Sequence, residues 1–235
     1  MISVVIIAHN EERYISQCIE SLLNQTQKPD EIVLVAHNCT DRTFEIAKQY
    51  PIRIVPCDGP TGVVHARIKG IESVTGDYIL CIDGDSFAQK NWVEVMSSTL
   101  YKNVLVGSWI AFDGGFFEII SNWFNRCFCV SKGQRATRWI WGASFAFHSK
   151  YKEAVIEILK RSINLSTELH LSRNPDDYWL ALFMSKLGTL EVTNKTHVTA
   201  HIKEIGLKDS LARNKENKRN GDLMRLYIAK QIRVI

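Results

Sequence analysis

The chain has 235 residues, of which 46% are hydrophobic and 23% are charged, and its formal net charge is +4. These proportions are typical of a globular protein and exclude an intrinsically disordered chain, a collagen or a coiled coil. The positive charge is concentrated at the end, because residues 202–235 carry a net charge of +5 and the first 201 residues a net charge of −1. The longest apolar runs are far shorter than the roughly 18 residues of a transmembrane helix, so none is expected.

The N-terminus and the cysteines indicate a cytoplasmic protein. The first residues contain no basic segment and no small-residue cleavage site, so we expect no secretory signal. No two cysteines form the Cys-x-x-Cys pair that is typical of zinc and redox sites. We therefore expect reduced thiols at the six cysteines, which are Cys18, Cys39, Cys57, Cys81, Cys127 and Cys129.

Apolar strands and amphipathic helices alternate in the first part of the sequence, as they do in α/β proteins. The expected strands are residues 2–8, 31–36, 52–55 and 78–82. The expected helices are residues 15–23, a helix that opens near Thr40, and residues 64–74. Asn10 is the expected cap of the first helix. This alternation predicts a nucleotide-binding half with a mainly parallel sheet.

The second part of the sequence is less regular. The expected elements are strands at 105–112 and 139–147, a helix over 177–187, and two short strands or one bent strand over 190–201. Between the first two strands, apolar residues from Phe116 to Phe128 share one wide helical face. We interpret it as a core helix, with a membrane-seated helix as the alternative. The chain from Leu207 onwards is helical by composition.

Polar residues follow the apolar strands, and ligands bind at such strand ends in open α/β sheets. These residues are His9, Asn10 and Glu11, then 37–41, 58–67 and 83–85. No G-x-G-x-x-G follows the first strand, and no G-x-x-x-x-G-K-[ST] occurs anywhere. The sequence therefore disfavours a dinucleotide-dependent dehydrogenase and a P-loop NTPase.

Asp83 and Asp85 are separated by one glycine at the end of a buried strand. In an extended chain residues i and i+2 project to the same side, so both carboxylates are able to serve one hard cation. The expected ion is Mg²⁺ or Mn²⁺ that bridges a diphosphate. The alternative is a turn that is stabilised by aspartate hydrogen bonds and binds nothing.

Five stretches of the sequence, taken together, resemble the family 2 glycosyltransferases with the GT-A fold. They are residues 3–12 (first strand), 19–26 (first helix), 62–79 (approach to the metal motif), 83–85 (the metal motif) and 141–147 (acceptor-side strand). The order and spacing of these motifs are specific, and the resemblance extends from residue 2 to about residue 201. It implies an α/β fold of GT-A type, with a mixed, mainly parallel sheet and helices on both faces.

The resemblance also implies an activity and a site. The activity is metal-dependent, inverting transfer of a sugar from a nucleotide-diphospho-sugar, most readily a UDP-sugar, to an acceptor hydroxyl. The implied metal ligands are Asp83, Asp85 and His201, with Mn²⁺ or Mg²⁺ as the ion. The implied donor-binding residues are Asn10, Glu11, Asn38, Asp41, Arg67 and Asp83. The implied acceptor-side residues are Trp141, Gly142 and Asp176, and Asp177 is the implied catalytic base.

Several of these residues have structural alternatives. Asp176 and Asp177 stand where the family has a Glu-Asp pair at the start of a helix, but the helix dipole alone favours acids there. Asp176 is expected to cap the helix or to contact the acceptor. His201 is otherwise a solvated histidine at the end of an edge strand. Trp139 and Trp141 would share a strand face and either stack on a sugar or pack in the core.

The loop after the second strand departs from the family pattern. The family usually presents acidic residues there, one of which contacts the nucleobase, whereas residues 36–41 are Ala-His-Asn-Cys-Thr-Asp. His37 and Asn38 are the candidates that remain for contact with the base. Two other functions stay open, which are a non-catalytic sugar-nucleotide-binding or subunit protein of the same fold and a sugar-1-phosphate nucleotidyltransferase. This sequence lacks the glycine-rich, basic first loop that such a nucleotidyltransferase has.

The resemblance divides the chain into a GT-A domain over 1–201 and a basic helical tail over 202–235. Within the domain, residues 1–112 are the nucleotide-sugar half and residues 113–201 the acceptor half. The acceptor is expected to be a saccharide or a lipid-linked molecule in polysaccharide or glycoconjugate synthesis, and no nucleic-acid partner is expected. The tail either contacts the inner face of an anionic membrane peripherally or packs on the domain.

Overall fold

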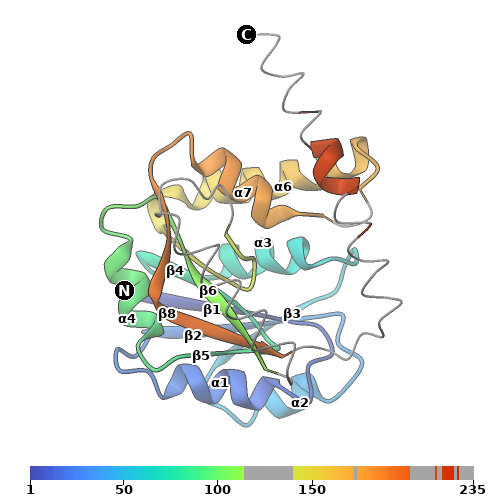
Figure 1. Cartoon of the computed structure of the whole chain (residues 1–235). Helices are drawn as coiled ribbons and strands as arrows, with labels where there is room; N and C mark the ends of the chain where they lie inside the picture. Colours follow the sequence, from blue (N-terminus) through green and yellow to red (C-terminus); the bar gives the residue numbers. More distant parts are fainter. Residues whose placement is uncertain (114–139, 172–173, 202–214, 216–218, 225–226, 228–235) are drawn as a thin grey trace.

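The computed structural model describes residues 1–113, 140–171, 174–201, 215, 219–224 and 227. An eight-stranded sheet in the order β3-β2-β1-β4-β7-β6-β8-β5 forms its centre (Figure 1). The strands are β1 (Ile2–Ala8), β2 (Glu31–His37), β3 (Arg53–Cys57), β4 (Tyr78–Asp83), β5 (Ser86–Ala88), β6 (Leu105–Asp113), β7 (Ser144–His148) and β8 (Leu190–His201). The helices are α1 (Ile15–Leu23), α2 (Thr43–Ala47), α3 (Val63–Ser73), α4 (Trp92–Thr99), α6 (Lys152–Glu168) and α7 (Asp176–Met184), with a 3₁₀ turn η2 (Ser149–Tyr151).

The sheet is mixed. Strands β3, β2, β1 and β4 run parallel, β7 is antiparallel to β4 and β6, β6 is parallel to β8, and β5 is antiparallel to β8. In Figure 1, α1 and α2 lie below the sheet and α3, α6 and α7 lie above it. The expected mixed sheet with helices on both faces is therefore confirmed.

The pattern of β1 explains why helices cover both faces. Val4 and Ile6 pack into one apolar layer with residues of α1, α2 and α4. Val5 and Ile7 pack into the opposite layer with residues of α3, α6 and α7. Successive side chains of a strand point to opposite faces, so a strand that is buried on both faces is apolar at every position.

The elements expected in the first part of the chain are confirmed, with shifts of a few residues at their ends. The cap expected at Asn10 is wrong, because α1 begins only after Tyr14 and has no side-chain cap. Asn10 instead adopts a left-handed conformation with φ 57° and its Oδ1 accepts hydrogen bonds from the next loop. Strand β5 and helices α4 and α6 were not expected.

Two expectations for the second part change. Strand β7 begins at Ser144, so Trp141 lies in the turn before it and the argument that two tryptophans share a strand face is wrong for Trp141. Trp141 is partly buried against the core layer of α1 and α4. Residues 190–201 form one strand. Its register with β6 shifts between Ser108 and Trp109. Trp139 and the apolar stretch 116–128 lie outside the described residues.

The described part of the tail packs on the domain. Met224 is buried and joins a small apolar cluster with Trp179 of α7, and the ring of Tyr227 contacts the Trp179 ring edge-on at 6.1 Å between centroids. None of the helices in the described ranges has the length and hydropathy that a bilayer-spanning segment needs. Leu226 and Ile228, two apolar residues of the tail, are outside the described side chains.

Candidate functional site

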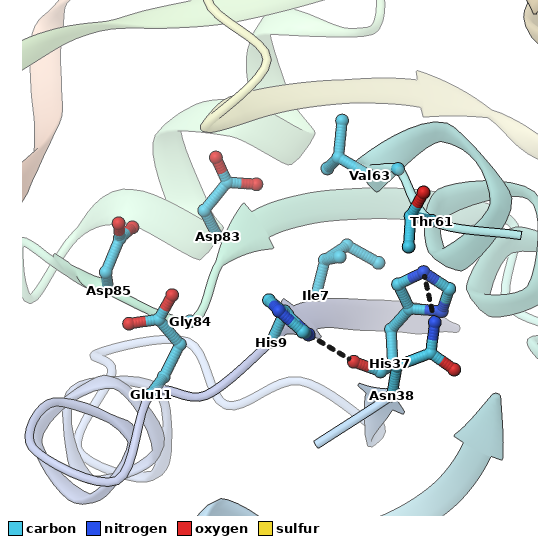
Figure 2. Close-up of a pocket in the computed structure, with 11 residues that line it drawn as sticks. Ile7, His9, Glu11, His37, Asn38, Thr61, Val63, Asp83, Gly84 and Asp85 are labelled. Atoms are coloured by element: carbon cyan, nitrogen blue, oxygen red, sulfur yellow. Dashed lines mark hydrogen bonds between the residues drawn. The ribbon is translucent and has the colours of Figure 1, made fainter. Parts of the chain in front are cut away.

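A pocket of about 370 Å³ opens at the carboxyl ends of β1, β2 and β4 (Figure 2). This is the edge at which ligands bind in sheets of this kind. The residues that line it come from four segments that are distant in sequence, each at the end of a strand or the start of a helix. They are Ile7, His9, Glu11, His37, Asn38, Thr61, Gly62, Val63, Asp83, Gly84 and Asp85.

Hydrogen bonds tie the loop after β1 to the loop after β2. The Thr40 N–H donates to Asn10 Oδ1 at 2.8 Å, and the Glu12 N–H donates to Asp41 Oδ2 at 3.0 Å. Partial burial raises the pKa of Asp41, but hydrogen bonds from Thr43 and Glu12 outweigh that effect and leave the pKa below its usual value. Asn10 and Asp41 were expected to bind the donor, whereas their contacts here hold two loops together beneath the pocket.

Two histidines and an asparagine from the ends of β1 and β2 form one side of the pocket. His9 Nδ1 lies 2.8 Å from the His37 carbonyl oxygen, and His37 Nδ1 lies 3.0 Å from the Cys57 carbonyl oxygen. A carbonyl oxygen only accepts, so both Nδ1 atoms carry the proton. Asn38 donates to the Gly59 carbonyl at 3.0 Å and accepts from the Gly59 N–H at 3.2 Å. Asn38 therefore fixes the loop that contributes Thr61 and Gly62.

The Asp-Gly-Asp motif lies on the opposite side of the pocket. Strand β4 ends at Asp83, so Asp85 belongs to the following turn and not to the extended chain that the sequence predicted. Gly84 donates to the Ile7 carbonyl at 2.8 Å, and a Cβ at this position would lie 3.0 Å from Ala8 Cβ. The glycine thus allows close packing against β1. In Figure 2 both aspartates face the same hollow as Glu11.

Arg67 of α3 joins three parts of the site. Its side chain is only 2% exposed and forms ion pairs with Asp176 and with Asp83, the latter at 3.3 Å. It also donates to the Gly142 carbonyl at 3.1 Å. The end of β4, the turn before β7 and the start of α7 therefore converge on one guanidinium. Its planar fork of donors suits contact with several acceptors at once.

Asp177 is held next to this cluster. Its Oδ2 accepts from the Gly142 N–H at 3.3 Å, and its Oδ1 accepts from the Tyr178 N–H at 2.7 Å. Gly142 thus contacts Arg67 through its carbonyl and Asp177 through its N–H. A Cβ on Gly142 would lie 3.2 Å from the Arg67 guanidinium, so any larger residue here would have to displace Arg67 slightly.

Two carboxyl groups of the site have raised pKa values. Burial raises the pKa of Asp177 to about 6, and the charge of Asp176 adds to that effect. Burial also raises the pKa of Asp83 to about 6, because it outweighs the opposing effect of Arg67. Such shifts are common in catalytic sites, although buried ion pairs in structural positions produce them too.

The backbone of His201 lies beside the Asp-Gly-Asp motif. Its N–H donates to the Asp85 carbonyl at 3.0 Å, which continues the pairing of β5 with β8. Its ring stacks on Tyr14 at 4.2 Å, and its Nε2 lies 2.9 Å from Gln17 Oε1. Within the described residues, no three His, Cys, Asp or Glu side chains form a group able to hold a metal ion. The assignment of His201 as a metal ligand stays a prediction.

Most of the predicted site residues fall into two groups. Glu11, Asn38, Asp83 and Asp85 line the pocket, whereas Asn10, Asp41, Arg67 and Asp176 hold its walls. Asp176 is 5% exposed and paired with Arg67, so it neither caps α7 nor reaches the open pocket. His9, Thr61, Gly62 and Val63 were not among the predicted site residues. The only signal for them was their position after strands.

Comparisons with known proteins show which family the chain belongs to. The model of glycosyl transferase family 2 matches residues 3–159. The glycosyltransferase GlyG of Streptococcus pneumoniae is 27% identical over 143 residues, which are 56% of this chain and 46% of GlyG. A glucosyl-dolichyl phosphate glucuronosyltransferase of Haloferax volcanii is 31% identical over 140 residues, which are 54% of this chain and 45% of that relative. The chain spans less than half the length of both relatives.

A solved structure supports the same conclusion for the fold. TarS of S. aureus, in a crystal structure with UDP-GlcNAc, aligns with a TM-score of 0.60 and 14% identity over 87% of this chain and 59% of the TarS chain. This likeness concerns the fold, and it agrees with the expected GT-A type. Since the family model covers well over half of the sequence, the chain belongs to glycosyl transferase family 2.

Proposed function

We propose that this protein transfers a sugar from a nucleoside-diphosphate-sugar to an acceptor hydroxyl, with inversion at the anomeric carbon. The observation that carries the proposal is the convergence of Asp83, Asp85 and Asp177 on one end of the sheet. Asp83 and Asp85 line the pocket, and Asp177 is tied to Asp83 through Gly142 and Arg67. Family membership supports the same reaction class.

Asp177 is the proposed base. As the acceptor oxygen bonds to the anomeric carbon, its proton moves to the Asp177 carboxylate and the nucleoside diphosphate leaves. A general base works best when its pKa lies near the working pH, and the raised pKa of Asp177, about 6, is suited to this role. The Gly142 and Tyr178 N–H groups fix the orientation of the carboxylate.

Asp83 and Asp85 are the proposed ligands of Mn²⁺ or Mg²⁺. Carboxylate oxygens suit these hard cations, which proteins commonly bind through one or two carboxylates together with substrate phosphates. Two acids that line one pocket fit that requirement without a third protein ligand. When bound, such a cation would stabilise negative charge on the departing diphosphate. Arg67 keeps the Asp83 carboxylate in place from behind the pocket.

The proposed donor is a UDP-sugar. The crystal structure of TarS with UDP-GlcNAc shows that a related fold binds such a donor, and this is support by analogy of fold. In this chain, His9, His37 and Asn38 surround the part of the pocket away from the aspartates, so we assign the nucleobase to that part.

A thermal-shift panel tests the donor class. Wild-type protein is heated with UDP, GDP, ADP, CDP and TDP and their common sugars, each with Mn²⁺ and with EDTA. A ligand that binds only the folded state raises the melting temperature. We expect the largest rise for a uridine nucleotide with Mn²⁺. A larger rise with another base would refute the assignment to UDP, and no rise with any nucleotide would contradict the proposed function.

A further inference from the structure

Helix α7 carries the proposed base, Asp177, on its first turn. Pro175 occupies the N-cap position, where a side-chain cap would otherwise stabilise the turn, and within the described residues α7 has no such cap. Toward the site, the turn is held by the ion pair of Asp176 with Arg67. The Gly142 N–H also donates to Asp177 at 3.3 Å. Packing on the other side of α7 therefore contributes to where Asp177 lies.

Two faces of α7 are buried in different apolar clusters. Three apolar residues follow Asp177 at helical spacing and share its face of the helix, namely Leu180, Ala181 and Met184. They pack in the layer that contains residues of α3. Trp179 falls outside this face and belongs to a separate cluster with Met224 and with residues of α6. Helix α7 is thus held from two sides.

Part of the tail contributes to the second cluster. The segment 219–224, red in Figure 1, is helical, and Met224 is only 4% exposed. The ring of Tyr227 meets the Trp179 ring edge-on, with 6.1 Å between the centroids. Trp179 itself is fully buried. The family model ends at residue 159, so α7 and this segment lie beyond the matched residues.

The second cluster reaches Asp177 through Tyr178. Side chains on a helix point back toward its N-terminus, so the Trp179 ring covers the first turn of α7. This ring contacts the Tyr178 ring edge-on, with 5.6 Å between the centroids. The Tyr178 N–H in turn donates to Asp177 Oδ1 at 2.7 Å. A continuous set of contacts therefore joins the tail to the carboxylate.

We propose that Met224 and Tyr227 are positioning residues for the proposed base. By packing on Trp179 they keep the first turn of α7 against the site, so that Asp177 stays hydrogen-bonded to Gly142. Displacement of a reacting group by about 1 Å is able to lower a rate by about 10²-fold, so a contact remote from the pocket matters for turnover. The inference rests on the proposed function, because it gives the tail a role through Asp177.

Hydrogen exchange of the Gly142 amide, measured by NMR, tests the inference without turnover. This amide is protected while it donates to Asp177, so its exchange rate reports how often the first turn of α7 moves away. Val5 is fully buried in β1, between β2 and β4, so its amide reports opening of the whole sheet. We expect Met224→Ala to raise the exchange rate of Gly142 relative to that of Val5 by about threefold to tenfold.

Met96→Ala is the matched control, because Met96 is fully buried in a different apolar layer, with residues of α1 and α2. Like Met224→Ala it leaves a cavity and should lower the melting temperature, but it should leave the exchange ratio unchanged. Tyr227→Phe keeps the ring on Trp179 and should behave as the wild type, whereas Tyr227→Ala should raise the exchange ratio. All four variants should bind UDP with wild-type affinity, since none of these residues lines the pocket.

Turnover connects the packing to the proposed base. Met224→Ala should lower kcat for UDP release from a UDP-sugar by about threefold to tenfold and leave the donor KM unchanged. Met96→Ala, measured well below its melting temperature, should keep the wild-type kcat.

An unchanged exchange ratio or an unchanged kcat in Met224→Ala would overturn the inference. So would an equal rise of the exchange ratio in Met96→Ala, or weaker UDP binding in Met224→Ala. Normal UDP release by Asp177→Asn would refute the proposed base and, with it, the role of the tail. Loss of UDP release in Asp177→Asn, together with an unchanged exchange ratio in Met224→Ala, would refute only the role of the tail.

Discussion

Asp176 and Asp177 are neighbours in sequence with different surroundings, and the two residues should respond differently to the same substitution. Asp177→Asn keeps the size of the side chain and removes the proposed base, so we expect the rate of nucleoside diphosphate release in sugar transfer to fall by about 10²–10⁴. Donor binding should be nearly unchanged, because Asp177 does not line the pocket that is proposed to bind the donor. Steady-state kinetics and donor titration measure the two quantities separately.

Asp176→Asn is the matched control for that experiment. The cap or acceptor contact that the sequence predicts for Asp176 would leave most of the activity in this variant, but the ion pair with Arg67 changes this expectation. The variant leaves a guanidinium that is 2% exposed without its closest counter-charge, and loss of one partner of a buried pair costs about 3–5 kcal/mol. Its unfolding midpoint should therefore fall. A stable Asp176→Asn that is inactive, beside an active Asp177→Asn, would move the base to Asp176.

The raised pKa of Asp177 predicts two opposite pH dependences. A base must be ionised, so kcat/KM should rise with pH through about 6. Stability should change the other way, because the folded chain keeps a proton on Asp177 up to about pH 6 whereas an unfolded aspartate loses it near 3.8. Ionisation of Asp177 therefore lowers the free energy of unfolding as pH rises from about 4 to about 6.

Chemical denaturation of the wild type and Asp177→Asn across this pH range checks the stability effect. The wild type should lose stability relative to the variant as pH rises. A constant difference between the two proteins, together with a kcat/KM that is flat from pH 5 to 7 (roughly one unit either side of the expected pKa), would show that Asp177 does not titrate there.

At the scale of elements, the contact between α3 and β1 positions Arg67. Gly70 lies one turn after Arg67, and a Cβ at Gly70 would lie 2.3 Å from Val5 Cγ1 and 3.0 Å from Val35 Cγ2. Gly70→Ala should therefore push α3 away from the sheet and lower the free energy of unfolding by about 1–3 kcal/mol, the usual cost of overpacking. Urea denaturation measures this change.

Gly59→Ala is the control for Gly70→Ala, because no atom lies within 4 Å of a Cβ at Gly59. It should leave stability almost unchanged. If both variants unfold at the same urea concentration as the wild type, the close packing of α3 on β1 does not limit stability.

The sequence predicted elements well where the hydrophobic pattern is strong. Strand β1 is apolar at nearly every position because both of its faces are buried, and the pattern marks its limits clearly. Strand β5 has three residues and helix α6 has a polar face, so neither gives a comparable signal. The start of β7 was placed too early because Trp141 is apolar but lies in a turn.

The site was predictable to the extent that its residues directly follow strands. Asp83 and Asp85 were found in this way, and their order relative to the other motifs indicated the family. The ion pair of Arg67 with Asp176 joins residues 109 positions apart, so spacing alone does not reveal it. Thr61 and Gly62 line the pocket because Asn38 binds Gly59, which is again a contact between distant loops.

At the scale of the whole molecule, the tail is the part whose role the sequence left open. Met224 and Tyr227 pack on Trp179, which favours the alternative of a tail that docks on the domain. Truncation after Ile205 should therefore lower the melting temperature, because Trp179 loses its contacts with Met224 and Tyr227. The 235-residue chain and the truncated chain should both stay in the supernatant when sedimented with anionic liposomes at low salt. Sedimentation of the 235-residue chain alone would instead support the peripheral membrane contact.

The central claim is that the pocket binds a nucleoside diphosphate together with a divalent cation held by the Asp-Gly-Asp motif. Titration calorimetry of UDP with the wild type and Asp85→Asn, each in Mn²⁺ and in EDTA, tests it most directly. Glu157→Gln, an exposed acid on α6, is the control for loss of one negative charge.

We expect the wild type and Glu157→Gln to bind UDP in Mn²⁺ at least about tenfold more tightly than in EDTA, which corresponds to about 1.4 kcal/mol. Asp85→Asn in Mn²⁺ should bind only as tightly as the wild type in EDTA. Equal UDP affinity for the wild type and Asp85→Asn in Mn²⁺, or no difference between Mn²⁺ and EDTA for the wild type, would contradict the claim.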